Sequence, residues 1–286
     1  MCDTPDSLRA DGGTLFICGT PIGNLEDVSI RLLKTLRQVD AIACEDTRHT
    51  VKLLNRYHIK KKLVSYHEYS TMEREDQLLD FVASGKNLAL VSDAGMPVIS
   101  DPGSRLIKKA NERHIPVEVV PGPSACIAAL VLSGLPGNPF IFMGFAPEKT
   151  KARKAFFAAL KEETRTVIFY EAPHRLAASL ADLREEVGDD RPVSTVKEIT
   201  KKFQEMRPGT AQSLCEYYAG NEPRGEFCVV VGGYEPKTEE KSLEEIVQET
   251  EVLIASGVNK KDAIRQKAKE YGMAKSDLYK CFFADK

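Results

Sequence analysis

The sequence has no apolar run long enough to cross a membrane. Its hydrophobic stretches all fall short of the ~18–20 residues that a bilayer-spanning helix needs. The first segment, MCDTPDSLRADGG, has neither an apolar core nor a basic start, so we expect no signal peptide or anchor there, only a disordered tail. With 42% hydrophobic and 29% charged residues, these absences favour a globular protein of the aqueous phase.

Disulfide and metal-binding patterns are missing as well. The seven cysteines show no CxxC spacing: Cys2, Cys18, Cys44, Cys126, Cys215, Cys228 and Cys281. Three of them lie in apolar strand-like runs, where a free thiol behaves as a small hydrophobe. None of the five histidines has metal-ligand spacing. We therefore expect no metal and no disulfide, and a cytoplasmic location.

Net charge is also small, at -2, and by itself indicates no nucleic-acid partner. The basic residues are nevertheless clustered: residues 48–62 hold six Lys/Arg and no acid, and residues 149–154 hold four. Most such clusters are simply solvated faces. Two on a nearly neutral chain are also candidate contacts to phosphates.

Short apolar runs alternate with helical periodicity up to about residue 135. Strands are predicted at 14–18, 41–44, 62–66, 87–92 and 117–120, and helices at 27–38, 48–57, 74–85 and 103–114. This alternation predicts a mainly parallel sheet with helices on both faces.

A Pro/Gly-rich segment, SGLPGNP (residues 133–139), suggests a domain boundary before a second α/β pattern. There, strands are predicted at 140–145, 165–171, 192–199 and 226–233, and helices at 152–163, 174–187 and 211–219. Residues 242–283 carry only helical signals, which fit either a helix-turn-helix-like unit or a packing appendage. The predicted division is a tail (1–13), two α/β domains (14–135 and 136–235), and a linker with a small helical domain (236–286).

Four loops that follow predicted strands are unusually rich in Gly, Pro and polar residues: GTPIGNLED, EDTRHT, SDAGMPVISDPG and PGPSA. Ligands of doubly wound sheets bind at this edge. A dinucleotide site is disfavoured, because GTPIG is not GxGxxG and Pro21 stiffens the turn. The loops instead favour a compact ligand of mixed charge, although each loop alone could be ordinary turn chemistry.

Particular residues suit such a ligand. Asp93 could accept bonds from an ammonium or a ribose hydroxyl, and Gly95 lets backbone come close. Ser124 opens the next helix and offers an N-cap hydroxyl. Among the histidines, this reading puts only His67 at the functional edge.

Several motifs, in order, carry a family resemblance: TPIGNLEDVSIR, EDTRHT, LVSDAGMPVISDPG, VVPGPSA with SGLP, GFAPEK and FYEAPHRL. Together they resemble the small-subunit (16S) ribosomal RNA cytidine 2'-O-methyltransferases, of the tetrapyrrole-methylase class of S-adenosylmethionine-dependent enzymes. The likeness runs from about Thr14 to Gly233. Two places depart from the pattern: Met96, where a small or hydroxylated residue is expected, and the stretch VKEITKKFQEMRPG.

The resemblance implies two α/β domains of the tetrapyrrole-methylase type, a cofactor cleft between them, a small C-terminal helical unit and a homodimer. It implies S-adenosylmethionine as cofactor and small-subunit ribosomal RNA as partner. Matched by position, the cofactor-binding residues would be Ile22, Asp93, Gly95, Met96, Ser124, Ala125, Tyr170 and Glu226.

Methyl transfer to a ribose hydroxyl needs in-line alignment and help for a weak nucleophile. We expect Glu45 or Asp46 to orient or deprotonate the hydroxyl, and Arg48 to grip a phosphate. Alternatively, Asp46 and Thr47 only cap a helix while Glu45 pairs with Arg48. The substrate-binding candidates are Asn24, Arg48, Lys52 and Lys201, the last also a weak candidate base.

Two other functions stay open. One is a methyltransferase with the same fold and cofactor that acts on a porphyrinoid ring. The basic clusters and the terminal helices argue against this function. The other is a non-catalytic RNA-binding assembly factor, which would leave the loop residues without a role.

Overall fold

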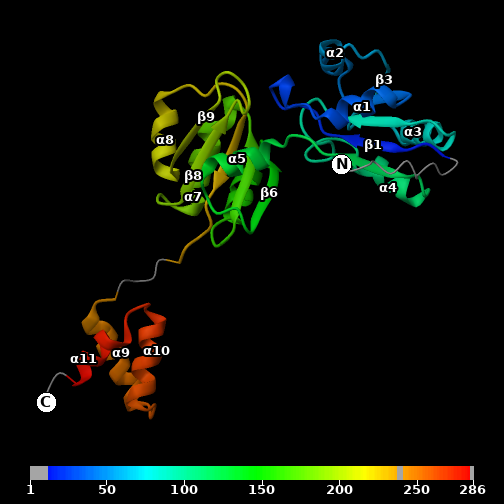
Figure 1. The fold of residues 1–286 in the computed structure, drawn as a ribbon. Coiled ribbons are helices and arrows are strands. Elements are labelled where there is room, and N and C mark those ends of the chain that lie inside the picture. The colour runs from blue at the N-terminus through cyan, green and yellow to red at the C-terminus, as the bar shows by residue number, and fades with distance from the viewer. Residues whose placement is uncertain (1–11, 237–240, 284–286) are drawn as a thin grey trace. The chain divides into compact units, whose positions relative to one another are not determined.

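The computed structural model describes residues 12–236 and 241–283, so the predicted tail lies almost wholly outside the described residues. The chain divides into two compact units, Met1–Tyr234 and Glu235–Lys286. The first unit holds two five-stranded sheets, and the described residues of the second form helices and no strand (Figure 1).

The first sheet is entirely parallel, with the order β3-β2-β4-β1-β5. Its strands are β1 (Leu15–Cys18), β2 (Ala41–Cys44), β3 (Lys62–Ser65), β4 (Leu88–Val91) and β5 (Val117–Val120). In the central register, Leu15 lies opposite both Leu88 and Val117. All five predicted strands are confirmed, and their carboxyl ends bring the polar loops to one edge.

Helices cover both faces of this sheet, as the alternating pattern predicts (Figure 1). Helices α1 (Ile30–Gln38) and α2 (Thr47–Arg56) pack on one face, and α3 (Met72–Ala83) and α4 (Ser104–Glu112) on the other. A short 3-10 turn, η1 (Leu25–Asp27), precedes α1. Alanine and cysteine in β2 leave room for the leucines of the helices.

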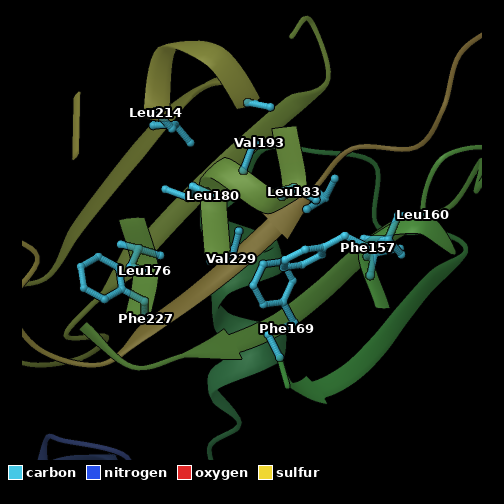
Figure 2. Close-up of a cluster of buried hydrophobic side chains, with 14 of the residues drawn as sticks. Phe157, Leu160, Phe169, Leu176, Leu180, Leu183, Val193, Leu214, Phe227 and Val229 are labelled. Atoms are coloured by element: carbon cyan, nitrogen blue, oxygen red, sulfur yellow. The ribbon is translucent and has the colours of Figure 1, made fainter. Parts of the chain in front are cut away.

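The second sheet is mixed, with the order β6-β7-β10-β8-β9. Its strands are β6 (Phe140–Phe145), β7 (Thr166–Glu171), β8 (Pro192–Lys197), β9 (Glu205–Thr210) and β10 (Phe227–Val231). Helices α6 (Thr150–Ala158), α7 (Pro173–Val187) and α8 (Ala211–Gly220) cover one face. Figure 2 shows this core, in which Phe157 and Phe169 meet at a ring distance of 5.3 Å.

Helix α5 (Ala125–Ser133) covers the opposite face of the second sheet. Its buried residues Cys126, Ala129 and Leu130 pack against Ile168 and Val230. This helix ends at Ser133, the first residue of the SGLPGNP segment, yet it packs against strands that follow that segment.

The sequence reading missed strand β9, which is an edge strand. Pro208 interrupts its strand-like pattern, since proline has no N–H to give to a ladder. Proline is tolerated at a sheet edge, and here Pro208 lies opposite Ser194 of β8.

Within residues 241–283, the second unit contains the helices α9 (Leu243–Ala255), α10 (Lys260–Glu270) and α11 (Lys275–Phe283). Ser242 and Glu245 form a reciprocal capping box at the start of α9. Ile246, Ile264, Ala268 and Leu278 make a core separate from the others. No helix among the described residues is both long and apolar enough to span a membrane.

Candidate functional site

One pocket of about 360 Å³ is lined by loops of both sheets. The first sheet contributes the loops after β1, β4 and β5, and the second contributes the ends of β7 and β10, Phe145 of β6 and the loop after β8. The lining residues include Ile22, Asp93, Gly95, Met96, Ile99, Ser100, Asp101, Ser124, Ala125, Phe145, Tyr170, Glu171, Glu198, Ile199, Lys201 and Glu226.

The 92–103 loop forms one wall through a backbone that most residues avoid. Gly95, Val98, Ser100 and Gly103 have φ values of 81°, 78°, 65° and 135°. A β-branched valine with positive φ is an outlier, and such strain concentrates at functional sites. Two backbone bonds hold the loop to the loop after β1: Thr20 N–H to Gly95 O at 2.9 Å, and the reverse at 3.1 Å.

Glycines let the loops after β1 and β5 touch directly. A Cβ on Gly122 would lie 2.6 Å from the carbonyl oxygen of Gly19, and a Cβ on Gly19 would lie 2.5 Å from the Met96 sulfur. No larger residue fits without moving backbone. The Gly-rich turns therefore bring Met96 and the start of α5 to the same wall.

All eight predicted cofactor residues line this pocket, as does Lys201 from the substrate set. Ser124 is the N-cap residue of α5, but its side chain makes no capping bond. Its Oγ lies 3.2 Å from the Cys126 sulfur instead. Burial raises the pKa of the Tyr170 phenol far above its usual range, so this hydroxyl stays protonated.

The predicted catalytic residues follow β2 beside the pocket. Asp46 is the N-cap of α2 and accepts the Arg48 N–H at 2.8 Å. Its carboxylate also holds the Arg48 guanidinium, with Nη2 2.6 Å from Oδ2, and this pairing lowers the pKa of Asp46 to about 2. The alternative pairing of Glu45 with Arg48 is wrong, because Arg48 binds Asp46. Arg48 itself is 86% exposed in its side chain.

Glu45, like Asp46, is partly buried. Burial, with Asp93 and Glu68 nearby, raises the pKa of its carboxyl. Asp93 connects this region to the pocket: its Oδ1 accepts the Asp46 N–H at 3.1 Å. The EDTRHT loop is thus tied directly to a pocket residue.

The expectation that only His67 reaches this edge is wrong. His49 Nδ1 lies 3.1 Å from Asp93 Oδ2. His49 stands in the first turn of α2, and a helix turn brings its side chain back over the loop that precedes the helix. This known direction of side chains in the first helical turn could have identified His49 from the sequence.

The remaining substrate candidates occupy different places. Asn24 caps η1 through its side chain, and its N–H donates to Thr200 Oγ1 at 3.1 Å. Lys52 is exposed on α2. Lys201 Nζ lies 3.0 Å from Glu198 and 3.3 Å from Glu226. Burial works against the Lys201 charge, but the two glutamates prevail and raise its pKa, so it is held as an ammonium rather than a base.

Several residues that line the pocket were not predicted from the sequence. Asp101 belongs to the quoted loop, and burial, with Glu45 nearby, raises its pKa to about 6. Glu171 of FYEAPHRL is buried, and its carboxylate is held by Arg175 at 2.7 Å and by the Ala172 N–H at 2.8 Å. The motifs contained these residues, but no spacing rule indicated which side chains turn inward.

The residues present fit S-adenosylmethionine. Carboxylates of Asp93, Asp101 and Glu226 suit its cationic groups, and Ile22, Met96 and Tyr170 offer apolar surface for flat or thioether-like parts. The glycine contacts keep backbone N–H and C=O groups at the wall. Among the described residues, no cluster of three or more His, Cys, Asp or Glu has a metal-holding arrangement.

Comparisons with known proteins identify the family. Residues 14–215 match the family of Tetrapyrrole (Corrin/Porphyrin) Methylases. The chain is 43% identical over 278 residues to the Ribosomal RNA small subunit methyltransferase I of Halalkalibacterium halodurans, covering 96% of each. The protein of the same name from Thermotoga maritima is 48% identical over 223 residues, which are 78% of this chain and 100% of that one.

Solved structures share the fold. The uroporphyrin-III C-methyltransferase of Thermus thermophilus, complexed with S-adenosyl homocysteine, matches with a TM-score of 0.53 at 18% identity, over 77% of this chain and 97% of that one. The methyltransferase CobJ matches with a TM-score of 0.59 at 18% identity, over 77% and 94%. On its motifs, its two sheets and these matches, the chain belongs to the tetrapyrrole methylase family.

Proposed function

We propose that this protein transfers a methyl group from S-adenosylmethionine to the 2'-hydroxyl of a cytidine ribose in small-subunit (16S) ribosomal RNA. The observation that carries the proposal is the shared pocket: residues from both sheets, far apart in sequence, converge on one cavity with the chemistry of that cofactor. The high identity to proteins named small-subunit ribosomal RNA methyltransferases supports the choice of acceptor.

S-adenosylmethionine, when bound, supplies a methyl group already activated on a sulfonium. The chain's residues therefore have to bind, align and exclude water. Ile22, Met96 and Tyr170 would provide apolar walls, and Asp93 and Glu226 would attract the positive charges. The backbone at Gly95 and at Ser124–Ala125 would hold polar groups of the cofactor.

The acceptor hydroxyl is a weak nucleophile and must lose a proton during transfer. Glu45 suits this role best of the three catalytic candidates, because its partial burial raises its affinity for a proton. Asp46 would orient Arg48 through their ion pair, and the exposed Arg48 would bind a phosphate. Asn24, Lys52 and Lys201 would position the RNA around this edge.

We also place the protein in the cytoplasm, as a homodimer. Helix α5 is apolar on all sides, a composition typical of a helix buried all round. One face packs on the second sheet, while Ile127 and Val131 on another are 45% and 77% exposed. A second copy that covers this face would remove that apolar surface from water; sedimentation equilibrium measures the association.

The direct test is transfer of labelled methyl from S-adenosylmethionine to small ribosomal subunits from cells that lack this protein. Nucleoside mass spectrometry should find the label on a cytidine ribose. Tight cofactor binding without label on subunits or free RNA would favour the porphyrinoid reaction. No cofactor binding would favour the non-catalytic assembly factor.

Kinetics of single variants would then separate the catalytic roles. Glu45→Gln should lower kcat with little change in the KM for subunits, whereas Arg48→Ala should mainly raise that KM. Asp46→Asn should raise the KM for subunits less than Arg48→Ala does, because it removes only the charge that orients Arg48. Wild-type kinetics in all three variants would contradict the assignment.

A further inference from the structure

The loop of residues 198–204, between β8 and β9, borders the pocket directly. Glu198, Ile199 and Lys201 are among the pocket's lining residues. The loop after β1 holds it in place: a Cβ on Gly23 would lie 2.6 Å from Lys201 Cγ and 2.8 Å from Thr200 Oγ1. Any side chain at residue 23 would therefore crowd the 198–204 loop.

Internal bonds fix the shape of the 198–204 loop. Thr200 N–H donates to the Gln204 side-chain oxygen at 2.7 Å, and Lys201 N–H donates to Glu198 O at 2.9 Å. Glu198 and Thr200 have φ values of 50° and 65°, a region that non-glycine residues rarely adopt. Strain of this kind persists where the surroundings enforce it, most often at binding sites.

This rigid loop presents an aromatic ring to solvent. The Phe203 residue is 71% exposed. The Lys202 ammonium lies 5.6 Å from the ring centroid, and Lys202 forms no ion pair with any residue that the structure describes. Isolated exposed hydrophobic residues are common. This one differs because its loop is strained, anchored to the pocket and basic next to the ring.

We propose that Phe203 and Lys202 form a docking platform for single-stranded RNA, on which Phe203 stacks an unpaired base beside the target nucleotide while Lys202 binds its phosphate. The inference rests on the proposed function and names the form of RNA that the site accepts. Aromatic rings stack on any base, and an ammonium beside the ring attracts the connecting phosphate. A nucleotide held there would lie at the rim of the pocket, where methyl transfer takes place.

The physical consequence is a contribution to substrate affinity and not to cofactor affinity. Loss of one stacked base weakens binding by roughly tenfold. Loss of one phosphate contact should make the plot of log K for RNA binding against log salt concentration less steep, by a slope of about 0.7 to 0.9. Neither change should alter S-adenosylmethionine binding, because neither side chain lines the pocket.

The test compares Phe203→Ala, Phe203→Leu and Phe203→Trp in the full chain, with undermethylated small subunits as substrate. We expect Phe203→Ala and Phe203→Leu to raise the KM for subunits about tenfold. Phe203→Trp should retain the wild-type KM, because tryptophan also stacks. Calorimetric Kd values for S-adenosylmethionine should stay within about twofold in all three. Lys202→Gln should flatten the salt dependence of subunit binding.

Three outcomes would overturn the inference. One is a wild-type KM in Phe203→Ala. Another is full rescue by leucine, which would mean an apolar contact without stacking. The third is a change of oligomeric state in sedimentation, which would assign the ring to a subunit interface. If the wild-type protein itself transfers no methyl to subunits, the proposed function fails first; a defect confined to the variants leaves it intact.

Discussion

Asp101 shows how the pocket alters the chemistry of a single carboxyl group. Burial, then Glu45 and Asp93, raise its pKa from 3.8 to about 6, while a bond from Ser92 works in the other direction. Between these two pH values the folded protein binds a proton that the unfolded chain does not. Stability from this group therefore rises as pH falls from above 6 to about 4.

Replacing this carboxyl should stabilise the protein at neutral pH. Asp101→Asn removes a charge that the fold disfavours, so we expect a gain of about 1 kcal/mol in the free energy of unfolding at pH 7.5, allowing for solvent screening. The gain should shrink as the pH falls and nearly vanish below about pH 3, where Asp101 is protonated in both states. Urea unfolding at the two pH values measures it, with the exposed Asp27→Asn as control. A gain independent of pH would contradict this account.

Gly122 is needed for the contact between the loops after β1 and β5. Its Cβ position lies 2.6 Å from the Gly19 carbonyl oxygen. Gly122→Ala should push the loops apart, weaken S-adenosylmethionine binding at least tenfold and destabilise the fold by about 1–3 kcal/mol. Calorimetry and thermal unfolding measure the two effects.

Gly220→Ala is the matched control for this variant. Gly220 ends α8, and a Cβ there would meet no atom within 4 Å. Alanine also favours the helix. Equal losses in the two variants would mean that the contact at Gly122 is unimportant.

At the scale of elements, a buried ion pair joins α6 to α7. Arg153 Nε and Nη2 both lie 2.7 Å from Asp182 Oδ2, and Arg153 also donates to the Glu148 carbonyl at 3.2 Å. Both side chains are largely buried, so removing one partner leaves a charge away from water. Arg153 belongs to the basic 149–154 cluster, and this pairing removes it from the candidate RNA contacts.

Breaking this ion pair should weaken the packing of α6 against α7 and so destabilise the protein. Asp182→Ala should lower the free energy of unfolding by about 3–5 kcal/mol in urea unfolding. Asp189→Ala serves as control, because the Asp189–Arg184 pair is exposed and should matter far less. If both variants lose the same stability, burial of the pair is not the reason.

Which elements the sequence predicts depends on how local their signals are. The strands of the first sheet are short β-branched or apolar runs between helical repeats, and all were predicted. The pattern missed β9, because Pro208 is acceptable only at an edge, and edge position is a property of the whole sheet. The loops of the site could be predicted from the first sheet, because the carboxyl ends of its parallel strands lie at one edge. Tyr170 and Glu226 were predicted only from the family resemblance. No periodic pattern in the sequence indicates how the second sheet is placed against the first.

At the scale of the whole molecule, the terminal helical unit has its own core and its own charges. Lys267 pairs with Glu249 and Glu270, and Lys260 donates to the Phe282 carbonyl. Lys261, Arg265 and Lys269 form no ion pair within the described part of the chain, which leaves them available to phosphates.

Removing the terminal unit should therefore affect RNA but not the cofactor. A chain ending at Pro236 should keep its S-adenosylmethionine Kd and bind subunits more weakly, with a lower salt slope. The triple variant Lys261→Gln, Arg265→Gln, Lys269→Gln, which keeps the fold, should lower the slope by about 2 to 3. Unchanged subunit affinity in both proteins would exclude a role in RNA binding.

The position of α5 limits how this protein can be divided or recombined. In sequence, α5 follows β5 of the first sheet, but its residues Cys126, Ala129 and Leu130 belong to the core of the second sheet. A fragment cut at the SGLPGNP segment would leave one face of the second sheet bare and the helix without its support. Family members can therefore exchange their halves only if the junction lies before Ser124, so that the helix travels with the sheet it covers.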